Sequence, residues 1–358
     1  MVIPYLSLIK EQKKIYKLIH NKPHIFNNQK TFKEMYKKII SAFLVMLTGC
    51  SCGVFSTGCE INPGKNVLYQ VTPNADMLMN CYIIKTKSNK LIVIDGGGAG
   101  SPAANGYLYA ELQKISGKKI PEIEAWFLSH MHDDHINEFV LIGNNPEKKI
   151  KINNVYFNFP SKEFMQKTES GNFYRFYGEL ETAYDRFFGE GAFEKTNGKN
   201  LFEGDVVEID GIRFDVLLTV TDEENEKNIN DTSMIFRTTI DGQTIMFLGD
   251  AYIPEGKRLL EKYGDALKSD MVQMAHHGQS GVDKDVYAAI DPTVCLWPSP
   301  KWVFNNTSGT LRTFDVRQWM MDLGVKYHVV AGLHKTQEMT FPIDFDSLKE
   351  VDITPPAP

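Results

Sequence analysis

Residues 129–135 decide how the rest of this chain is interpreted, and they read Ser129-His130-Met131-His132-Asp133-Asp134-His135. His130 directly follows Ala125–Ser129, an apolar run that predicts a short buried strand. Residues two positions apart in an extended segment point to the same side, so the imidazoles of His130 and His132 face one way. Asp134 and His135 come next in a turn, from which they can face a second ion. Imidazole and carboxylate groups at this spacing form a donor set for divalent metals.

Three further strand ends carry groups of the same kind. Asp95 follows an apolar run, Asp250 follows the strand predicted at 244–248, and His276-His277 follows the one at 271–275. Catalytic sites are often assembled this way, on loops that a rigid sheet holds in place. The sequence leaves open which of His276 and His277 binds metal. We assign His276 to the metal and His277, with Asp134, to catalysis.

The pattern along the chain predicts strands and helices in mixed order within one domain at residues 67–345. Hairpins exclude a strictly parallel βαβ succession, so we expect an α/β fold whose mixed sheets are covered by helices. Residues near 161–200 are rich in aromatic and charged side chains, and we interpret them as a packed amphipathic helical insertion. Residues 346–358 end in Pro-rich sequence, which predicts a disordered tail.

The order His-x-His-x-Asp-His, then a strand-end Asp, then a strand-end His, resembles the metallo-β-lactamase superfamily. The resemblance implies an αββα sandwich with two metal ions at one edge of the sheets. It also implies roles for particular residues: Asp95 would buttress the site and Asp250 would bridge the ions. The implied metal ligands are His130, His132, Asp134, His135, Asp250 and His276.

A narrower resemblance is to the hydrolase domain of bacterial competence DNA-uptake proteins. It rests on Leu248-Gly249-Asp250-Ala251, Ala275-His276-His277-Gly278 and Asn230-Asp231-Thr232-Ser233. That branch lacks the middle ligand histidine of the superfamily, and here no histidine lies between His135 and His276. The chain departs from the branch at Ile136-Asn137-Glu138, where the branch has Gly-Gly. We expect Asn230 and Ser233 to lie near the ligands or the substrate, with Asn230 a candidate for the missing position.

These features predict a hydrolase that uses metal-bound hydroxide, with one or two ions of zinc or manganese. A phosphodiester is the first choice of substrate, in a small molecule or a polymer, nucleic acid included. The formal net charge of −6 gives no global basic field for nucleic acid. Two alternatives remain: a hydrolase of lactone or β-lactam-type esters and amides, and a surface lipoprotein that binds a solute without turnover.

The N-terminal region predicts export. Residues 35–49 have a short basic start and an apolar stretch, which is the layout of a signal peptide. Leu47-Thr48-Gly49-Cys50 resembles the lipobox of bacterial lipoproteins, in which the cysteine is acylated. We expect residues 1–34 to reflect a misassigned start and residues 50–66 to form a tether. The mature protein would then be a membrane-anchored lipoprotein facing the extracellular or periplasmic side, with Cys50 as its lipid attachment.

Overall fold

The computed structural model describes residues 64–72, 76–98, 106–168, 171–219 and 228–356, with the side chains of 171–174 left out. The predictions for residues 1–34, the signal peptide at 35–49, Cys50 and the tether up to residue 63 therefore lie outside the described residues. The folded part already includes Asn66, which is 2% exposed and donates from Nδ2 to Asp241. The expected tether thus gives way to packed structure before residue 67.

The first sheet contains the strand that leads into the histidine cluster. Its strands are β1 (Val67–Gln70), β2 (Cys81–Lys85), β3 (Leu91–Asp95), β4 (Glu122–Leu128), β5 (Lys151–Ile152), β6 (Val155–Phe157) and β14 (Gln337–Thr340). The order is β14-β1-β2-β3-β4-β5, with β6 also paired to β4. The predicted hairpin is present as the antiparallel pair β2–β3, whereas β3 and β4 run parallel.

The second sheet contains the strands that lead to Asp250 and to the second histidine pair. Its strands are β7 (Val206–Ile209), β8 (Ile212–Leu218), β9 (Ile235–Ile240), β10 (Gln243–Phe247), β11 (Met271–Gln273), β12 (Val294–Trp297) and β13 (Tyr327–Val330). They follow the order β13-β12-β11-β10-β9-β8-β7. The pairs from β7 to β10 are antiparallel and those from β10 to β13 are parallel.

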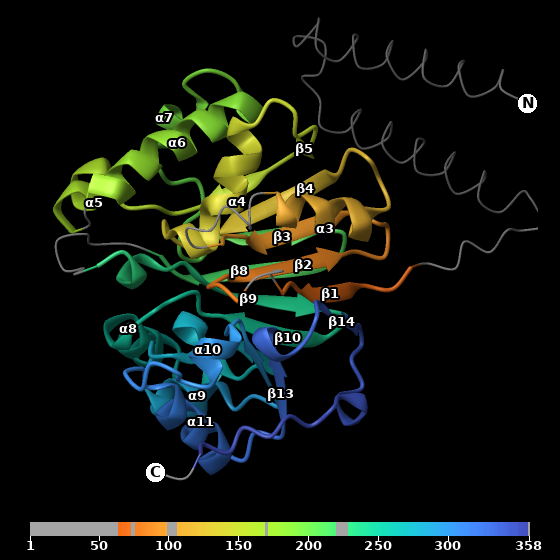
Figure 1. Cartoon of the computed structure of the whole chain (residues 1–358), viewed down its shortest axis with the longest axis vertical. Coiled ribbons are helices and arrows are strands. Elements are labelled where there is room, and N and C mark those ends of the chain that lie inside the picture. The colour runs from red at the N-terminus through yellow and green to blue at the C-terminus, as the bar shows by residue number, and fades with distance from the viewer. Residues whose placement is uncertain (1–63, 73–75, 99–105, 169–170, 220–227, 357–358) are drawn as a thin grey trace, which may run out of the picture. The chain divides into compact units, whose positions relative to one another are not determined.

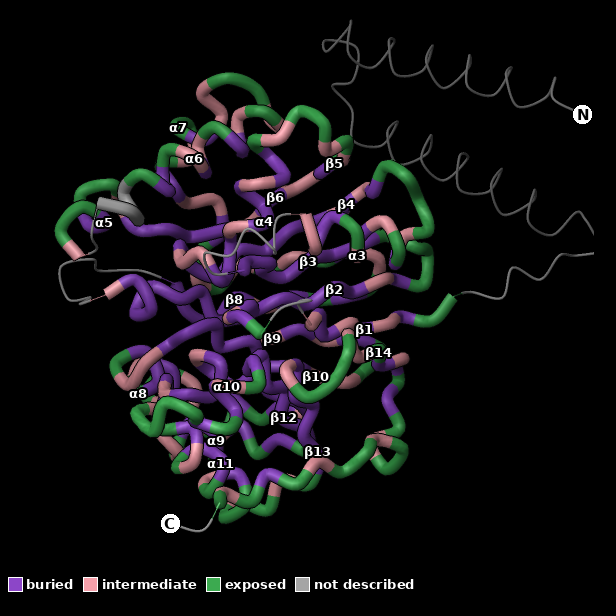
Figure 2. The backbone as a smooth tube through the Cα atoms, viewed as in Figure 1, coloured by how far each residue is buried: buried purple, intermediate pink, exposed green. Residues whose placement is uncertain are grey.

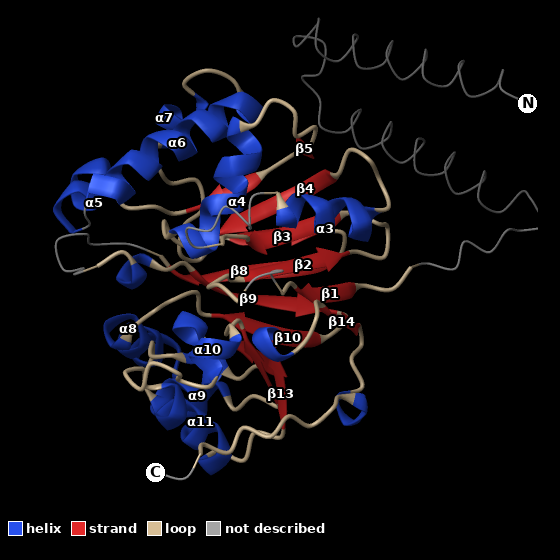
Figure 3. Ribbon diagram, viewed as in Figure 1, coloured by secondary structure: helices blue, strands red, loops and turns tan. Residues whose placement is uncertain are grey.

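Helices cover the outer face of each sheet (Figures 1 and 3). On the first sheet lie α3 (Tyr107–Ser116), α4 (Asp133–Asn144), α5 (Lys162–Thr168), α6 (Gly171–Phe188) and α7 (Ala192–Thr196); on the second lie α8 (Ile253–Tyr263), α9 (Lys284–Ile290), α10 (Lys301–Phe304) and α11 (Thr313–Asp322). Single-turn 3₁₀ segments include η3 (Asn230–Thr232), η5 (Ala275–Gly278) and η7 (Phe345–Ser347). In the described part of the chain, no helix combines the length and apolar character needed to cross a membrane.

Three apolar cores correspond to this layering. One lies between the first sheet and its helices, one between the two sheets, and one between the second sheet and its helices. Buried residues accordingly concentrate in the two sheets, while exposed residues lie mostly on the helices and connections (Figure 2). The predicted α/β class and the αββα sandwich are confirmed.

The helical insertion is packed by its aromatic side chains. Phe176, Tyr177, Tyr184 and Phe193 are all buried in the core that lies over the first sheet. Tyr184 and Phe193 form an edge-to-face pair with ring centroids 5.6 Å apart, a geometry that favours tight packing. The aromatic residues of this insertion thus form part of a core.

The sequence predicts a disordered tail at 346–358, and the structure describes residues 346–356 of it, part of which packs against the domain. Ile353 is 5% exposed and belongs to the core beneath the second sheet. The guanidinium of Arg317 donates to the backbone oxygens of Ile353 and Thr354, at 2.6 Å and 2.5 Å. One apolar anchor and charge-assisted hydrogen bonds hold the segment in place despite its Pro-rich sequence.

Glu138 is a buried acid on α4, one turn after the histidine cluster. Its carboxylate faces the backbone N–H groups of Gly106 and Leu108 at the start of α3, where no side chain of that helix provides a cap. Negative charge is favourable at a helix N-terminus, but burial dominates and raises the pKa of Glu138 to about 7. Glu138 is therefore a buried acid that remains partly protonated near neutral pH.

This shift predicts that stability depends on pH. Between pH 4.5 and pH 7 the folded state keeps a proton on Glu138 that the unfolded chain has released, so stability falls as the pH rises. We expect Glu138→Gln to gain up to about 3 kcal/mol in free energy of unfolding over wild type between pH 4.5 and pH 8. Urea denaturation at both pH values measures this, with Glu163→Gln, on the exposed side of α5, as control. An equal difference from wild type at both pH values would contradict the assignment.

Candidate metal centre

The carboxyl ends of two parallel strand pairs, β3–β4 and β10–β11, supply the candidate site. Each strand ends in a loop or the first turn of a helix, so donor groups from distant parts of the chain converge at one edge of the sandwich. The site residues are Asp95 at the end of β3, His130 and His132 after β4, Asp134 and His135 in the first turn of α4, Asp250 after β10, and His277 in η5.

Four of these side chains form the first potential ligand group: Asp134, His135, Asp250 and His277. All four residues are buried. Nε2 of His277 lies 2.9 Å from Oδ2 of Asp134, and Nε2 of His135 lies 3.0 Å from Oδ1 of Asp250. The four donor atoms all lie within 4.8 Å of one another, near the ~4 Å that two opposite metal–ligand bonds of ~2 Å would span.

Three side chains form the second group: His130, His132 and again Asp250. Nε2 of His130 lies 3.1 Å from Nδ1 of His132 and 4.0 Å from Oδ2 of Asp250. Asp250 belongs to both groups, which suits a carboxylate that bridges two ions. The second group contains one protein donor fewer than the first.

The buried atoms of this cluster fit metal ions better than they fit one another. Both carboxylate oxygens of Asp250 and Nε2 of His135 are buried without a well-formed hydrogen bond, although Nε2 lies 3.0 Å from Oδ1 of Asp250. Buried polar atoms without a partner are costly and therefore rare in folded proteins. Their donor types, imidazole nitrogen and carboxylate oxygen, are those that zinc and manganese accept.

Asp95 hydrogen-bonds with two residues of the first histidine cluster, Ser129 and His135. Its Oδ2 accepts a hydrogen bond from Ser129 Oγ at 2.8 Å and pairs with Nδ1 of His135 at 2.8 Å. Its Oδ1 accepts from the backbone N–H of Ser129 at 2.7 Å. A carboxylate on one imidazole nitrogen sets the tautomer so that the other nitrogen can bind metal. Asp95 thus lies where it can orient His135 towards a metal ion.

Charge in the cluster is distributed unevenly. Burial alone lowers the pKa of His135, but the carboxylates of Asp250 and Asp95 offset this effect and hold the pKa well above its usual value. Burial, together with the neighbouring His135, holds the pKa of His130 well below its usual range. An ion that binds through His135 must therefore displace a proton, which makes metal affinity depend on pH.

The sequence assigns His276 to the metal and His277 to catalysis, whereas the candidate donor groups of the structure include His277 and not His276. Nδ1 of His277 donates to the backbone oxygen of Pro298 at 2.9 Å, which aims Nε2 at Asp134 and Asp250. Nδ1 of His276 pairs instead with Ser280 Oγ at 2.6 Å, outside both ligand groups. Both histidines have positive φ, 47° and 54°, so two neighbouring side chains diverge at this turn.

The loops of the site pack closely and contain energetically unfavourable backbone conformations. Asp95 also has positive φ, 56°, a conformation that non-glycine residues adopt at a cost of about 1–3 kcal/mol. At Gly97 a Cβ atom would come within 2.1 Å of the backbone oxygen of Asp133. Only glycine allows the loop after β3 to lie this close to the histidine cluster.

The two predicted supporting residues on the segment before β9 have different surroundings. Ser233 Oγ accepts a hydrogen bond from the backbone N–H of Asp250 at 3.0 Å, so Ser233 holds the backbone of Asp250 in place. Asn230 is 7% exposed, and its side chain hydrogen-bonds to the phenol of Tyr252. Tyr252 was not singled out in the sequence, because it belongs to no metal-ligand pattern. His334, the other late histidine, is exposed and lies outside both ligand groups.

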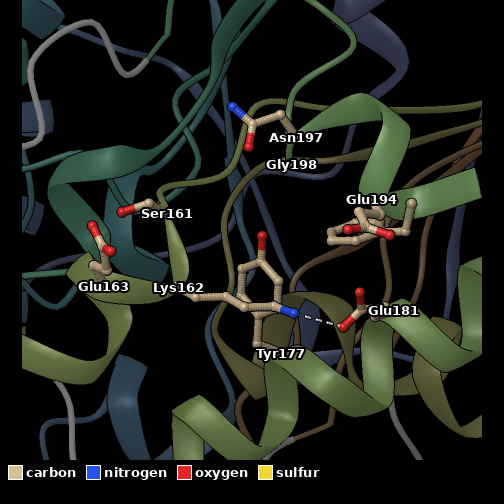
Figure 4. Close-up of a pocket in the computed structure, with 9 residues that line it drawn as sticks. Ser161, Lys162, Glu163, Tyr177, Glu181, Glu194, Asn197 and Gly198 are labelled. Atoms are coloured by element: carbon tan, nitrogen blue, oxygen red, sulfur yellow. Dashed lines mark hydrogen bonds and ion pairs between the residues drawn. The ribbon is translucent and has the colours of Figure 1, made fainter. Parts of the chain in front are cut away.

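A separate pocket of about 350 Å³ lies in the helical insertion (Figure 4). Nζ of Lys162 lies 2.8 Å from Oε2 of Glu181 and 5.2 Å from the centre of the Tyr177 ring. An ion pair between partly exposed groups contributes little to stability. The pocket shares no lining residue with the candidate metal centre.

The unequal donor sets predict two ions of unequal affinity. Protein purified without chelator should hold one to two ions of zinc or manganese, with the tighter ion in the four-donor group. We expect His132→Ala to lose the weaker ion alone and His277→Ala to weaken the tighter one. Metal content after dialysis against graded chelator measures both, with His334→Ala as control. Two ions released together in wild type, or no bound transition metal, would contradict this prediction.

Comparison with solved structures gives alignments of low identity. YhfI from Bacillus subtilis, a metallo-β-lactamase fold protein, aligns over 77% of this chain and 99% of its own, at 11% identity and TM-score 0.44. CmlA, a diiron β-hydroxylase from Streptomyces venezuelae, aligns over 78% of this chain and 55% of its own, at 11% identity and TM-score 0.48. A diphosphatase from the PhnP family aligns over 77% and 98%, at 12% identity and TM-score 0.40.

No curated protein sequence matches the chain. The family assignment rests on a family model instead. The model described as "Metallo-beta-lactamase superfamily" matches residues 77–285, which is more than half of the chain and includes both ligand groups. The chain therefore belongs to the metallo-β-lactamase superfamily of metal-dependent hydrolases.

Proposed function

We propose that this hydrolase acts on phosphodiesters through a centre of two divalent ions, zinc or manganese. The observation that carries the proposal is the sharing of Asp250 between two adjacent ligand groups. Two ions bound side by side can neutralise the charge on both the attacking and the leaving oxygen of a phosphodiester, and can acidify water near neutral pH. The substrate would be a small molecule or a polymer, with nucleic acid as one possible polymer.

The residues of this chain would hold the centre rigid during the reaction. Asp250 joins the two groups, while Ser233 fixes its backbone from the second sheet. Asp95 and the Pro298 carbonyl set the orientation of His135 and His277, so that neither imidazole needs to reorganise. Preorganised ligands of this kind reduce the reorganisation that catalysis would otherwise require.

The narrower similarity to competence DNA-uptake hydrolase domains belongs to the same proposal. It is supported by the sequences at 230–233, 248–251 and 275–278, all of which lie at or beside the ligand groups. It favours a phosphodiester over a lactone or β-lactam. Because neither has the middle histidine, an ion held by His130 and His132 would keep a position free for a substrate oxygen.

Turnover of generic phosphodiesters tests the proposed reaction. The metal-loaded protein should hydrolyse bis(p-nitrophenyl) phosphate, and His132→Ala or Asp134→Ala should abolish that turnover while the fold is retained. Circular dichroism and thermal melts check the fold, and His334→Ala is the matched histidine control. Wild-type protein that leaves phosphodiesters intact but opens a lactone or a β-lactam would support the alternative substrate class. A metal-loaded protein inactive on all three would favour a binding lipoprotein without turnover.

We also propose that the protein is exported and held at the membrane surface by a lipid on Cys50. The support is the sequence of residues 35–50: a basic start, an apolar stretch and a lipobox-like ending, in that order. The folded domain would then face the extracellular or periplasmic side.

Replacing the cysteine tests this proposal. Cys50→Ala should yield soluble protein or an uncleaved precursor, since no acylation site would remain in the lipobox. Membrane fractionation and mass spectrometry of the mature N-terminus measure the outcome, with Cys59→Ala as the matched control. A correctly cleaved Cys50→Ala protein that stays in the membrane fraction would rule the proposal out.

A further inference from the structure

Tyr252 lies at the open edge of the metal centre, two residues after the shared ligand Asp250. It precedes α8, and its backbone N–H donates to the carboxylate of Glu255 at 3.3 Å. Its ring meets the imidazole of His276 edge to face, with centroids 4.9 Å apart and planes at 81°. The helix start thus fixes a tyrosine directly against the histidine that the ligand groups leave out.

A chain of neutral hydrogen-bonding groups runs from this tyrosine to the imidazole. Burial raises the pKa of the Tyr252 phenol, and hydrogen bonding from the side chains of Ser280 and Asn230 counteracts this rise. Ser280 Oγ in turn lies 2.6 Å from Nδ1 of His276. The oxygen of the Asn230 amide is buried and has no hydrogen-bond partner. Three separate segments therefore supply polar groups to the same small region.

His276 lies between the metal centre and solvent. Its Nε2 is 3.8 Å from Oδ2 of Asp250, close to the shared ligand but outside both ligand groups. Its side chain is 17% exposed, whereas that of His277 is 0% exposed. Nδ1 is bonded to Ser280, and Nε2 lies 3.2 Å from the amide nitrogen of Gln279, so a substrate oxygen at Nε2 would replace Gln279.

We propose that Tyr252 is a positioning residue that holds His276, through Ser280 and ring contact, as a substrate-binding imidazole at the edge of the metal centre. The inference rests on the proposed function for the identity of the substrate, a phosphodiester, but not for the positioning itself. An imidazole already held at one orientation loses little side-chain entropy when it contacts a substrate, and it can donate to a phosphoryl oxygen once its Nε2 carries a proton and Gln279 has moved away. The two hydrogen bonds and the ring contact supply that orientation.

Nitrogen-15 NMR of the imidazoles in the zinc-loaded protein tests the positioning directly. Tyr252→Phe keeps the ring and removes only the hydroxyl, and Ser280→Ala removes the link. Both should shift the His276 ring nitrogens while the His277 ring nitrogens and the metal content stay as in wild type. Tyr263→Phe is the matched control: it removes a hydroxyl bonded to Leu217 at the far end of the same helix. Unchanged His276 resonances in both variants would overturn the proposal.

Kinetics with bis(p-nitrophenyl) phosphate test the consequence for the substrate. Tyr252→Phe should lower kcat/KM about tenfold, the effect of one lost hydrogen bond of ~1.4 kcal/mol. The same substitution should have little further effect in a His276→Ala background, since coupled residues are not additive. Equal effects in both backgrounds, or metal loss in His276→Ala, would overturn the proposal. If wild type hydrolyses no phosphodiester, the substrate class fails while the NMR result still decides the positioning.

Discussion

A single buried carboxylate, Asp250, constrains the whole candidate site. It is 1% exposed and its oxygens have no well-formed hydrogen bond. A carboxylate removed from water requires nearby positive charge or a metal, because burying it alone is very costly. The imidazoles around it come from both sheets: His130 and His135 follow β4, and His277 follows β11. Satisfying this one group therefore fixes how the carboxyl ends of the two sheets face each other.

Some residues around the candidate metal centre adopt backbone conformations that reduce the stability of the fold. Asp95, His276 and His277 all have left-handed backbone conformations, each with a cost of about 1–3 kcal/mol. Such conformations persist only where the surrounding structure determines them. Here the strand ends, the carbonyl of Pro298 and the close approach of Gly97 supply that constraint. Strained loops on rigid sheets can hold ligands in positions that a relaxed loop would not keep.

Local patterns were enough to predict most strands and the first histidine cluster, because hydrophobic periodicity and metal-donor spacing are local. Local patterns did not predict the placement of side chains that depends on contacts with residues distant in the sequence. His276 and His277 are adjacent, and only the turn geometry and the Pro298 carbonyl separate their roles. Tyr252 fits no ligand pattern and gains its position from Ser280 and His276, far away in the sequence. The C-terminal segment looks disordered by composition, yet Ile353 anchors it in a core.

The absence of a middle histidine and the partial exposure of His132 and His276 both bear on where the reaction would take place. In the four-donor group every residue is buried, whereas His132 in the three-donor group is half-buried. His276, which neighbours the shared Asp250, is also partly exposed. An ion held at His130 and His132 would thus combine the weaker protein coordination with the better access from solvent. Catalytic metals need an open position, and structural ones are closed. From the asymmetry of the donors we therefore propose that the reaction would take place on the His132 side, next to His276.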